Sequence, residues 1–204
     1  MDGFTTGASD TPGAEAPPPK IQLTPADWIT AATHVLVDQS IDAVRVDVLA
    51  KLLKVTRGSF YWHFKDRNDL LARILTRWRD AATERVIQRF EDSGDKPANL
   101  VRDLLSLPSR GRVARDTATI ELAIRAWARR DEMARQAVDM VDAKRLGYIQ
   151  QCFVHLGCAE VEAQSRAFTV YGYIIGESLL SAQGTEAQRL AWRHFIERTV
   201  LAGI

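Results

Sequence analysis

The stretch Val46–Leu71, VDVLAKLLKVTRGSFYWHFKDRNDLL, decides the fold of this chain. It predicts two short helices, over residues about 46–53 and 57–63, joined by a tight turn. Two helices that cross at a steep angle need a small residue at the crossing point, and Ala50 supplies it. Apolar side chains that can form their shared core stand at suitable positions, namely Leu49, Leu53, Val55 and Phe60. The stretch therefore predicts a helix-turn-helix.

The outer face of the second short helix carries side chains that suit a DNA groove. Thr56 is placed to cap this helix, which leaves Arg57, Ser59, Tyr61 and Trp62 to face outward. Such a helix fits the major groove, which is about 12 Å wide, and an arginine there can form a forked pair with guanine. Lys65 stands where the next helix begins, so that its charge and the helix N-terminus can both address phosphate. We expect this face to bind double-stranded DNA.

The charge distribution is consistent with a phosphate-binding face. The whole chain carries a formal net charge of +1, whereas residues 45–79 contain nine basic and three acidic residues. A local basic segment on a neutral protein can be the footprint of nucleic-acid binding. A solvated helix surface would look the same, so that charge alone leaves both interpretations open.

The segment Val55–Lys65, VTRGSFYWHFK, resembles the recognition helix of the tetracycline-repressor (TetR) family and the step into that family's fourth helix. The resemblance covers about residues 24–75, and continues to the C-terminus only as a similar layout of helices. It implies that Phe60 and Phe64 are core residues and that Arg45, just before the first short helix, touches phosphate. The remaining DNA contacts that it implies are Thr56, Arg57, Ser59, Tyr61, Trp62, His63 and Lys65.

Two positions depart from the family's pattern. The loop before the first short helix reads Ser40-Ile41-Asp42, and the turn carries Lys54, where the family usually has glycine. Glycine suits such a turn because a positive φ is easy without a Cβ atom. Lysine therefore either strains the turn or signals a slightly different geometry.

The rest of the chain predicts an all-α fold. Residues 1–22, rich in Gly, Ala, Thr and Pro, predict a disordered tail. A capping sequence at Thr24-Pro25 opens a first helix, and a long helix is expected over residues about 66–91. Further helices are expected at about 97–106, 116–130, 133–156, 160–182 and 186–202. We divide the chain into the tail, a three-helix helix-turn-helix domain over 23–66, and a helical regulatory and dimerisation domain over 67–204.

Several classes of function find no support in the sequence. No segment approaches the roughly 18 apolar residues of a membrane span, and the N-terminus lacks the features of a signal peptide, so that a cytoplasmic protein without membrane contact is expected. Cys152 and Cys158 have no metal-site spacing, and no histidine stands at ligand spacing from acids or cysteines. We predict no catalytic residue, no metal site and no cofactor.

A small-molecule effector is implied by the resemblance, because the family's ligand pocket lies among the helices that follow the DNA-binding domain. The candidate ligand contacts are Trp78 and Phe90 on the long helix, with Glu121, Arg125 and Trp127 on the helix at 116–130. Aromatic residues at helical spacing also make ordinary core. Glu121 and Arg125 stand four apart, as a plain ion pair on a helix surface would.

A homodimer is also implied by the resemblance, with the helices at 133–156 and 160–182 as the predicted interface. Two mid-helix glycines mark the second of these helices, since each costs about 1 kcal/mol relative to alanine and suggests close helix approach. Packing inside one chain would explain them equally well. The predicted interface residues are Gly172, Ile175, Gly176 and Leu179.

Together these features predict a homodimeric, ligand-responsive transcriptional regulator that represses from a palindromic operator. One alternative is an architectural DNA-binding protein without a ligand. Another is a helical carrier or enzyme whose basic region is incidental.

Overall fold

The computed structural model describes residues 23–180 and 182–204, and these residues form helices and no strand. The predicted tail over residues 1–22 lies outside the described residues, and the prediction of an all-α fold is confirmed. The helices are α1 Pro25–Asp38, α2 Val46–Leu52, α3 Arg57–Tyr61, α4 Arg67–Arg79, α5 Arg85–Ser93, α6 Pro97–Ser106, α7 Gly111–Ala128, α8 Glu132–His155, α9 Glu160–Leu179 and α10 Glu186–Val200. No described helix has the length and apolar character needed to cross a membrane.

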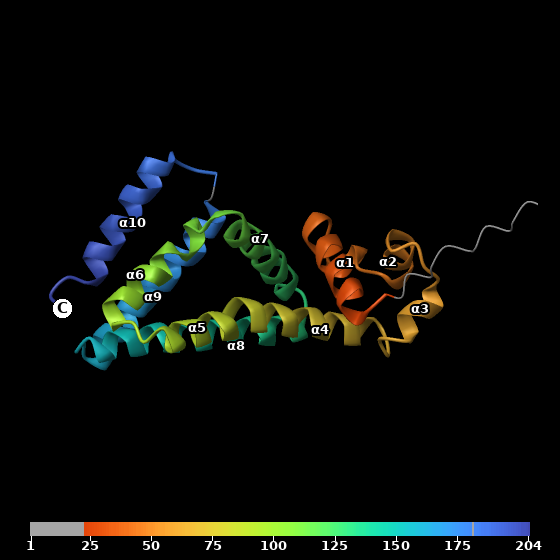
Figure 1. Ribbon diagram of the computed structural model, residues 1–204, viewed down its shortest axis with the longest axis horizontal. Helices are drawn as coiled ribbons and strands as arrows, with labels where there is room; N and C mark the ends of the chain where they lie inside the picture. The colour runs from red at the N-terminus through yellow and green to blue at the C-terminus, as the bar shows by residue number, and fades with distance from the viewer. Residues whose placement is uncertain (1–22, 181) are drawn as a thin grey trace, which may run out of the picture.

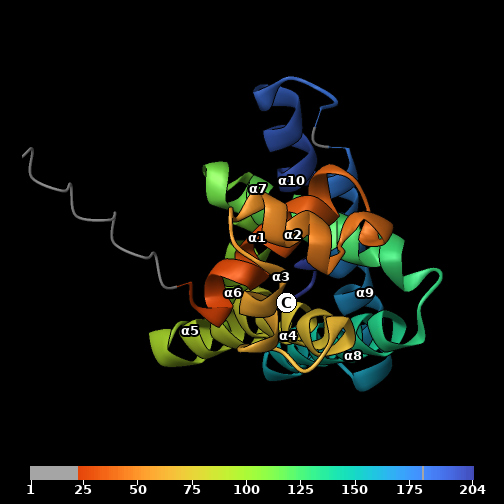
Figure 2. The same cartoon turned by 90° about the vertical axis from the view of Figure 1, so that its right-hand side faces the viewer.

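The helices are arranged in an elongated molecule with α1, α2 and α3 gathered at one end (Figure 1). The line formed by α4 and α5 runs from this end along α8 towards the other. Helix α10 lies at the outer edge, where it packs against α6 and α9. Figure 2 looks onto the α1–α3 end and shows these three helices in front of the remaining ones.

The three-helix unit is built on local signals that the sequence carries. Thr24 and Asp27 form a capping box, with Pro25 at the first helical position, and this fixes where α1 begins. Trp28 is fully buried and meets the ring of Phe60 edge-on, with 5.3 Å between the ring centres. Phe60 in turn stacks on Phe64 at 5.1 Å. This aromatic group joins α1 to α3 and fixes the orientation of α3.

The long helix predicted over residues 66–91 begins as expected but is interrupted. The Asp66 side chain accepts the backbone N–H of Asp69, which caps α4. Between α4 and α5 the chain forms a π-helical segment over Asp80–Glu84, in which the Arg85 N–H bonds to the Asp80 carbonyl. Such insertions are rare and are frequently found at functional sites. The apolar pattern of the sequence gives no sign of it.

The apolar residues form two cores, and the first one crosses the predicted domain boundary. It joins the three-helix unit to α4, to the end of α7 at Ile124 and Trp127, and to the start of α8. The second core joins α5, α6, the end of α8 and α9, and includes Val200 of α10. The helix-turn-helix is thus packed directly on helices of the C-terminal part of the chain, so that a movement of those helices reaches it through packed side chains.

Candidate functional site

The side chains predicted to contact DNA lie on one short segment, from α3 to the start of α4. Arg57 and Lys65 are exposed, while Ser59 and His63 are half-buried. Tyr61 is 56% exposed and Trp62 is 87% exposed, although both are large aromatic residues. Phe60 and Phe64 are buried directly behind them, as the resemblance implies. The buried rings of Phe60 and Phe64 therefore support an exposed surface of aromatic and positively charged side chains.

The first residues of α3 differ in one detail from the prediction. Thr56 holds the N-cap position, but its side chain makes no capping hydrogen bond, so that the predicted role as a side-chain cap is wrong. The bond at this position is made by the backbone, where the Ser59 N–H donates to the Thr56 carbonyl at 3.1 Å. The exposed Thr56 side chain therefore belongs to the outer surface of α3 rather than to its cap.

The turn between α2 and α3 holds Lys54 at φ +56°. Two backbone bonds close this turn, from the Val55 N–H to the Ala50 carbonyl at 3.0 Å and from the Lys54 N–H to the Lys51 carbonyl at 3.2 Å. This pair of bonds is the Schellman motif, whose left-handed position normally carries glycine. The turn therefore has the geometry that glycine would adopt, and holding lysine in this left-handed conformation costs about 1–2 kcal/mol.

Five of the basic residues in this region are bound within the protein. Arg67 donates to the carbonyls of Val44 and Ile41 at 2.6 and 2.7 Å, and Arg77 donates to Thr30 Oγ1 at 2.9 Å. These bonds tie α4 to the three-helix unit. The remaining three form ion pairs with neighbouring acids, namely Arg45 with Asp47, Arg73 with Asp69 and Arg79 with Asp80. The excess of basic residues in the sequence therefore overstates the charge available to DNA, and the predicted phosphate contact of Arg45 competes with Asp47.

A cavity of about 400 Å³ lies between α5, α6, α7, α8 and α9. Its size falls within the range of small-molecule sites in proteins. The π-helical segment contributes Ala81, Ala82 and Thr83 to its wall. Most of the wall is apolar, including Val86, Ile87, Leu104, Leu107, Ile149 and Ile174.

A cluster of ionised side chains forms the polar part of this wall. Arg145 donates to Glu121 Oε1 at 2.8 Å and to Glu121 Oε2 at 3.0 Å. Arg125 donates to the same carboxylate at 2.9 Å and to Asp142 at 3.0 Å. Tyr171 donates its hydroxyl to Asp142 at 2.6 Å. Glu121, Arg145 and Tyr171 line the cavity, whereas Arg125 and Asp142 lie behind them.

The interactions within the cluster favour the ionised forms of its two carboxyl groups and its two arginines. Burial opposes the charge on Glu121, but Arg145 and Arg125 outweigh burial and hold the pKa of that carboxyl below its ordinary value. Burial likewise opposes the charge on Asp142, and the bonds from Arg125 and Tyr171 lower its pKa. Burial raises the pKa of Tyr171 to about 12, so that this phenol stays protonated. The two carboxylates and the two arginines leave the cluster with no net charge.

Arg145 also holds the π-helical segment. It donates to Thr83 Oγ1 at 3.1 Å and to the Ala82 carbonyl at 3.2 Å, in addition to Glu121 and Tyr171. All five N–H donors of the guanidinium are then engaged, because Arg has five. The same residue thus borders the cavity and fixes the point where α4 meets α5.

The predicted ligand contacts fall into two groups. Glu121 lines the cavity, and Arg125 forms an ion pair with Glu121. Trp78 and Trp127 are buried in the first core and Phe90 in the second, and none of these three lines the cavity. Their role in ligand binding stays a prediction; in the structure they pack as ordinary core residues. Arg145 and Tyr171 were missed, because neither has a sequence signal that points to a partner on another helix.

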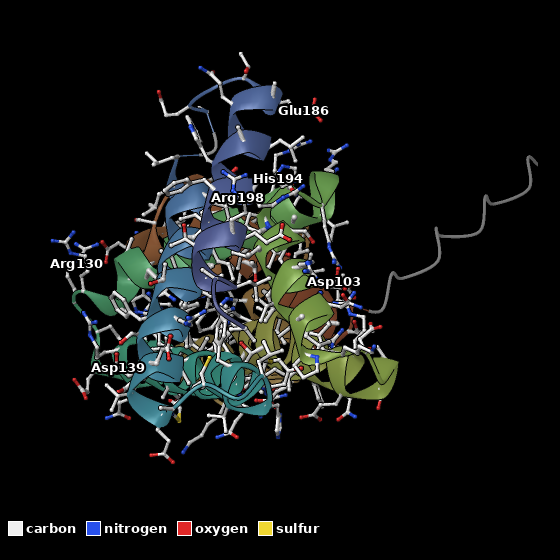
Figure 3. The ribbon with its side chains drawn as sticks, turned by 90° about the vertical axis from the view of Figure 1, so that its left-hand side faces the viewer. Asp103, Arg130, Asp139, Glu186, His194 and Arg198 are labelled. Carbon is white, nitrogen blue, oxygen red and sulfur yellow. The ribbon has the colours of Figure 1, made fainter. Side chains whose placement is uncertain are left out.

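The predicted dimer residues on α9 differ in exposure, since Gly176 is half-buried and Ile175 is half-buried against the second core. Gly172 and Leu179 are exposed, and a Cβ atom added at Gly172 or Gly176 would meet nothing within 4 Å. These glycines are therefore not explained by packing within the chain. On the same helix Phe168 is 70% exposed, and on α10 Phe195 is 60% exposed. Figure 3 shows α10 in front of α9 and α6, with Glu186, His194 and Arg198 along it.

Comparison with known sequences finds a relation over the helix-turn-helix. Residues 29–74 match the family of bacterial regulatory proteins described as the tetR family. The chain is also 27% identical over 77 residues to the HTH-type transcriptional regulator AcrR of Shigella flexneri. That alignment covers 38% of this chain and 36% of AcrR, so that it spans little more than a third of the relative. No cluster of three His, Cys, Asp or Glu residues that could hold a metal is found in residues 23–180 and 182–204.

Solved structures share the fold over most of the chain. A transcriptional regulator of Rhodococcus sp. Rha1 superposes with a TM-score of 0.68 and 16% identity, covering 89% of this chain and 97% of that one. FadR of Bacillus subtilis, solved with stearoyl-CoA, superposes with a TM-score of 0.65 and 16% identity over 89% of this chain and all of FadR. Residues 29–74 therefore form a helix-turn-helix domain of the tetR family of bacterial regulatory proteins, in a chain that shares its overall fold with solved transcriptional regulators.

Proposed function

We propose that the chain is a homodimeric repressor that binds a palindromic operator and releases it when an apolar ligand enters the cavity. The observation that carries this proposal is the continuous helical connection between the two sites. Helix α4 begins beside the exposed face of α3, and its continuation into α5 forms a wall of the cavity. One element can therefore respond to a ligand at one end and reposition the recognition helix at the other.

DNA binding is supported by the exposed face of α3. The residues proposed to contact DNA are Arg57, Tyr61, Trp62 and Lys65, with Thr56, Ser59 and His63 beside them. Symmetric half-sites are expected about one helical turn apart or a multiple of it. A footprint on the DNA beside the chain's own gene tests this directly, because it would reveal a two-fold symmetric protected site.

Replacing Lys65 with alanine should weaken binding to every DNA sequence and flatten the salt dependence by about one unit of slope per protomer, because a phosphate contact is lost. Replacing Arg57 with alanine should instead relax the preference at particular base pairs, at about 1–3 kcal/mol for the lost contact. Titrations of operator and random duplex at several salt concentrations separate the two effects. Lys96→Ala, at the start of α6, is the control. Equal affinity of the wild type for operator and random DNA would contradict specific regulation.

Ligand control is supported by the cavity and by the way the π-helical segment is held. A ligand that presses on Ala82 or Thr83 would strain the bonds of Arg145 to this segment. Since Arg67 and Arg77 fasten α4 to the three-helix unit, a shift of α4 would carry the recognition helix with it. A coupling of about 1–3 kcal/mol would change operator affinity by 5- to 150-fold.

The chemistry of the cavity supports a ligand with a long apolar part. The ionised cluster is paired within itself and has no net charge, so that the apolar wall is the larger part of what the cavity offers. The exposed Arg89 and Arg110 also border the cavity; Arg110 is paired with Asp103, so that Arg89 is the proposed contact for an acidic head group. FadR of Bacillus subtilis, a structural relative, was solved with stearoyl-CoA, which has an apolar chain and an acidic head.

Stearoyl-CoA is therefore expected to lower operator affinity by 5- to 150-fold, whereas free CoA should have little effect. Ala118→Phe, which places a large ring in the cavity, should abolish the response while leaving affinity without ligand normal. Ala126→Phe adds the same ring to the exposed side of α7 and serves as the control. An unchanged response of the Ala118 variant would place the ligand elsewhere. No effect of any small molecule on DNA affinity would favour an architectural DNA-binding protein.

Dimerisation is proposed to use α9 and α10. Helix α8 packs against α4, α6, α7 and α9, so that it has less uncovered surface than the sequence suggests. Among the described residues, the large apolar side chains exposed on α8, α9 and α10 are Met140 on the first, Val161, Phe168 and Leu179 on the second, and Leu190, Trp192 and Phe195 on the third. The proposed interface therefore keeps the predicted Gly172, Ile175, Gly176 and Leu179 and replaces α8 with α10.

A further inference from the structure

Lys54 is the one described residue other than glycine that adopts a positive φ. Its value of +56° lies in the left-handed region, where a side chain is strained and glycine is not. The strain is imposed by the two backbone bonds that close the turn, so that lysine does not escape it by changing the backbone. A residue held in such a conformation is a reason to look for a function of its side chain.

The position of Lys54 places its side chain next to the DNA-binding face. It is exposed and stands two residues before Thr56, the N-cap of α3. In a helix-turn-helix the N-terminal residues of the recognition helix reach the base edges. The turn that leads into this helix then runs beside the sugar-phosphate backbone at the edge of the groove. A long, flexible ammonium side chain is suited to reach a phosphate from there.

A lysine at the end of a helix could instead stabilise the helix by binding its last carbonyls. In α2, however, three of the last four carbonyls already have backbone donors. Leu49 accepts the N–H of Leu53, Ala50 accepts that of Val55, and Lys51 accepts that of Lys54, at 2.9, 3.0 and 3.2 Å. The ammonium group is therefore not needed to satisfy these three carbonyls.

We infer that Lys54 is a further DNA-contacting residue whose ammonium group binds a backbone phosphate beside the recognition helix. The inference rests on the proposed DNA binding, and adds a contact from the turn to those from α3. Because a phosphate contact carries no sequence information, Lys54 would strengthen binding to operator and random DNA alike.

The inference predicts that stability and DNA binding respond in opposite directions. Lys54→Gly removes both the strain and the charge, so that the urea midpoint should stay the same or rise while DNA affinity falls. The slope of log Kobs against log salt should flatten by about 0.9 per bound protomer, which is about eightfold in affinity per protomer at 0.1 M salt. Lys54→Gln should lose the same affinity while keeping the strain, and Lys54→Arg should retain binding. Lys96→Gln removes an exposed lysine from the N-cap of α6 and should change neither property.

The variants are compared as full-length proteins on operator and random duplexes, with the urea midpoint measured on the same samples. If the wild type binds DNA in a salt-dependent way but neither Lys54→Gly nor Lys54→Gln changes the salt slope, Lys54 does not contact a phosphate. The proposed DNA binding would then stand without this contact. A wild type that shows no salt-dependent binding overturns the proposed function together with the inference. A lowered urea midpoint of Lys54→Gly would show that lysine stabilises the turn. It would contradict the prediction that stability and DNA affinity change in opposite directions.

Discussion

Replacing Arg145 with leucine is expected to lower the free energy of unfolding by about 3–5 kcal/mol, because it removes one partner from a buried ionised cluster. The Arg145 side chain is 14% exposed and that of Glu121 is 11% exposed. Without Arg145, the Glu121 carboxylate keeps only Arg125, and the Ala82 carbonyl and Thr83 lose the arginine that holds the π-helical segment. Urea denaturation at a fixed protein concentration measures the loss.

The matched control is Arg130→Leu. The Arg130 side chain is 68% exposed and lies 3.7 Å from Asp42, so that its loss should cost less than about 1 kcal/mol. The double variant Glu121→Gln, Arg145→Leu should recover part of the stability, because residue 121, which has lost one of its two arginine partners, is then uncharged. If Arg145→Leu and Arg130→Leu lower the free energy of unfolding by the same amount, the buried cluster does not stabilise the cavity wall as described.

Introducing a charge at Phe168 or Phe195 is expected to give a monomer and to weaken operator binding by about 10²- to 10⁴-fold, because the second half-site then no longer binds as part of the same molecule. Both side chains are more than half exposed in the single chain, so that glutamate there should leave the fold of the monomer intact. Sedimentation equilibrium gives the mass of each variant, and titration with the operator gives the affinity.

Met140→Glu distinguishes the two arrangements of the dimer. Met140 is 55% exposed on α8, the helix that the sequence predicts as part of the interface and that the proposal replaces with α10. If α9 and α10 form the interface, this variant should remain a dimer with normal affinity for the operator. A monomeric Met140 variant, together with a dimeric Phe195 variant, would restore α8 to the interface. A wild type that is a monomer at all concentrations would contradict dimerisation itself.

The sequence by itself determined the features that depend on neighbours close along the chain. The helix-turn-helix is contained in Val46–Leu71, and its core residues Ala50 and Phe60 were identifiable from their size and spacing. The start of α1 followed from the capping box at Thr24, which acts within four residues. The strain at Lys54 could also be anticipated, because a tight turn asks for a positive φ wherever its glycine is replaced.

The tertiary structure alone decided which of the remaining polar residues act together. Arg145 meets Glu121 across 24 positions and Thr83 across 62, and no local pattern marks partners so far apart. In the same way, Arg67 was one basic residue among nine in the sequence, and only packing showed that it binds the carbonyls of Val44 and Ile41. The cavity and the π-helical segment arise where five helices meet, because a gap between helices depends on how they are packed rather than on the order of residues in any one of them.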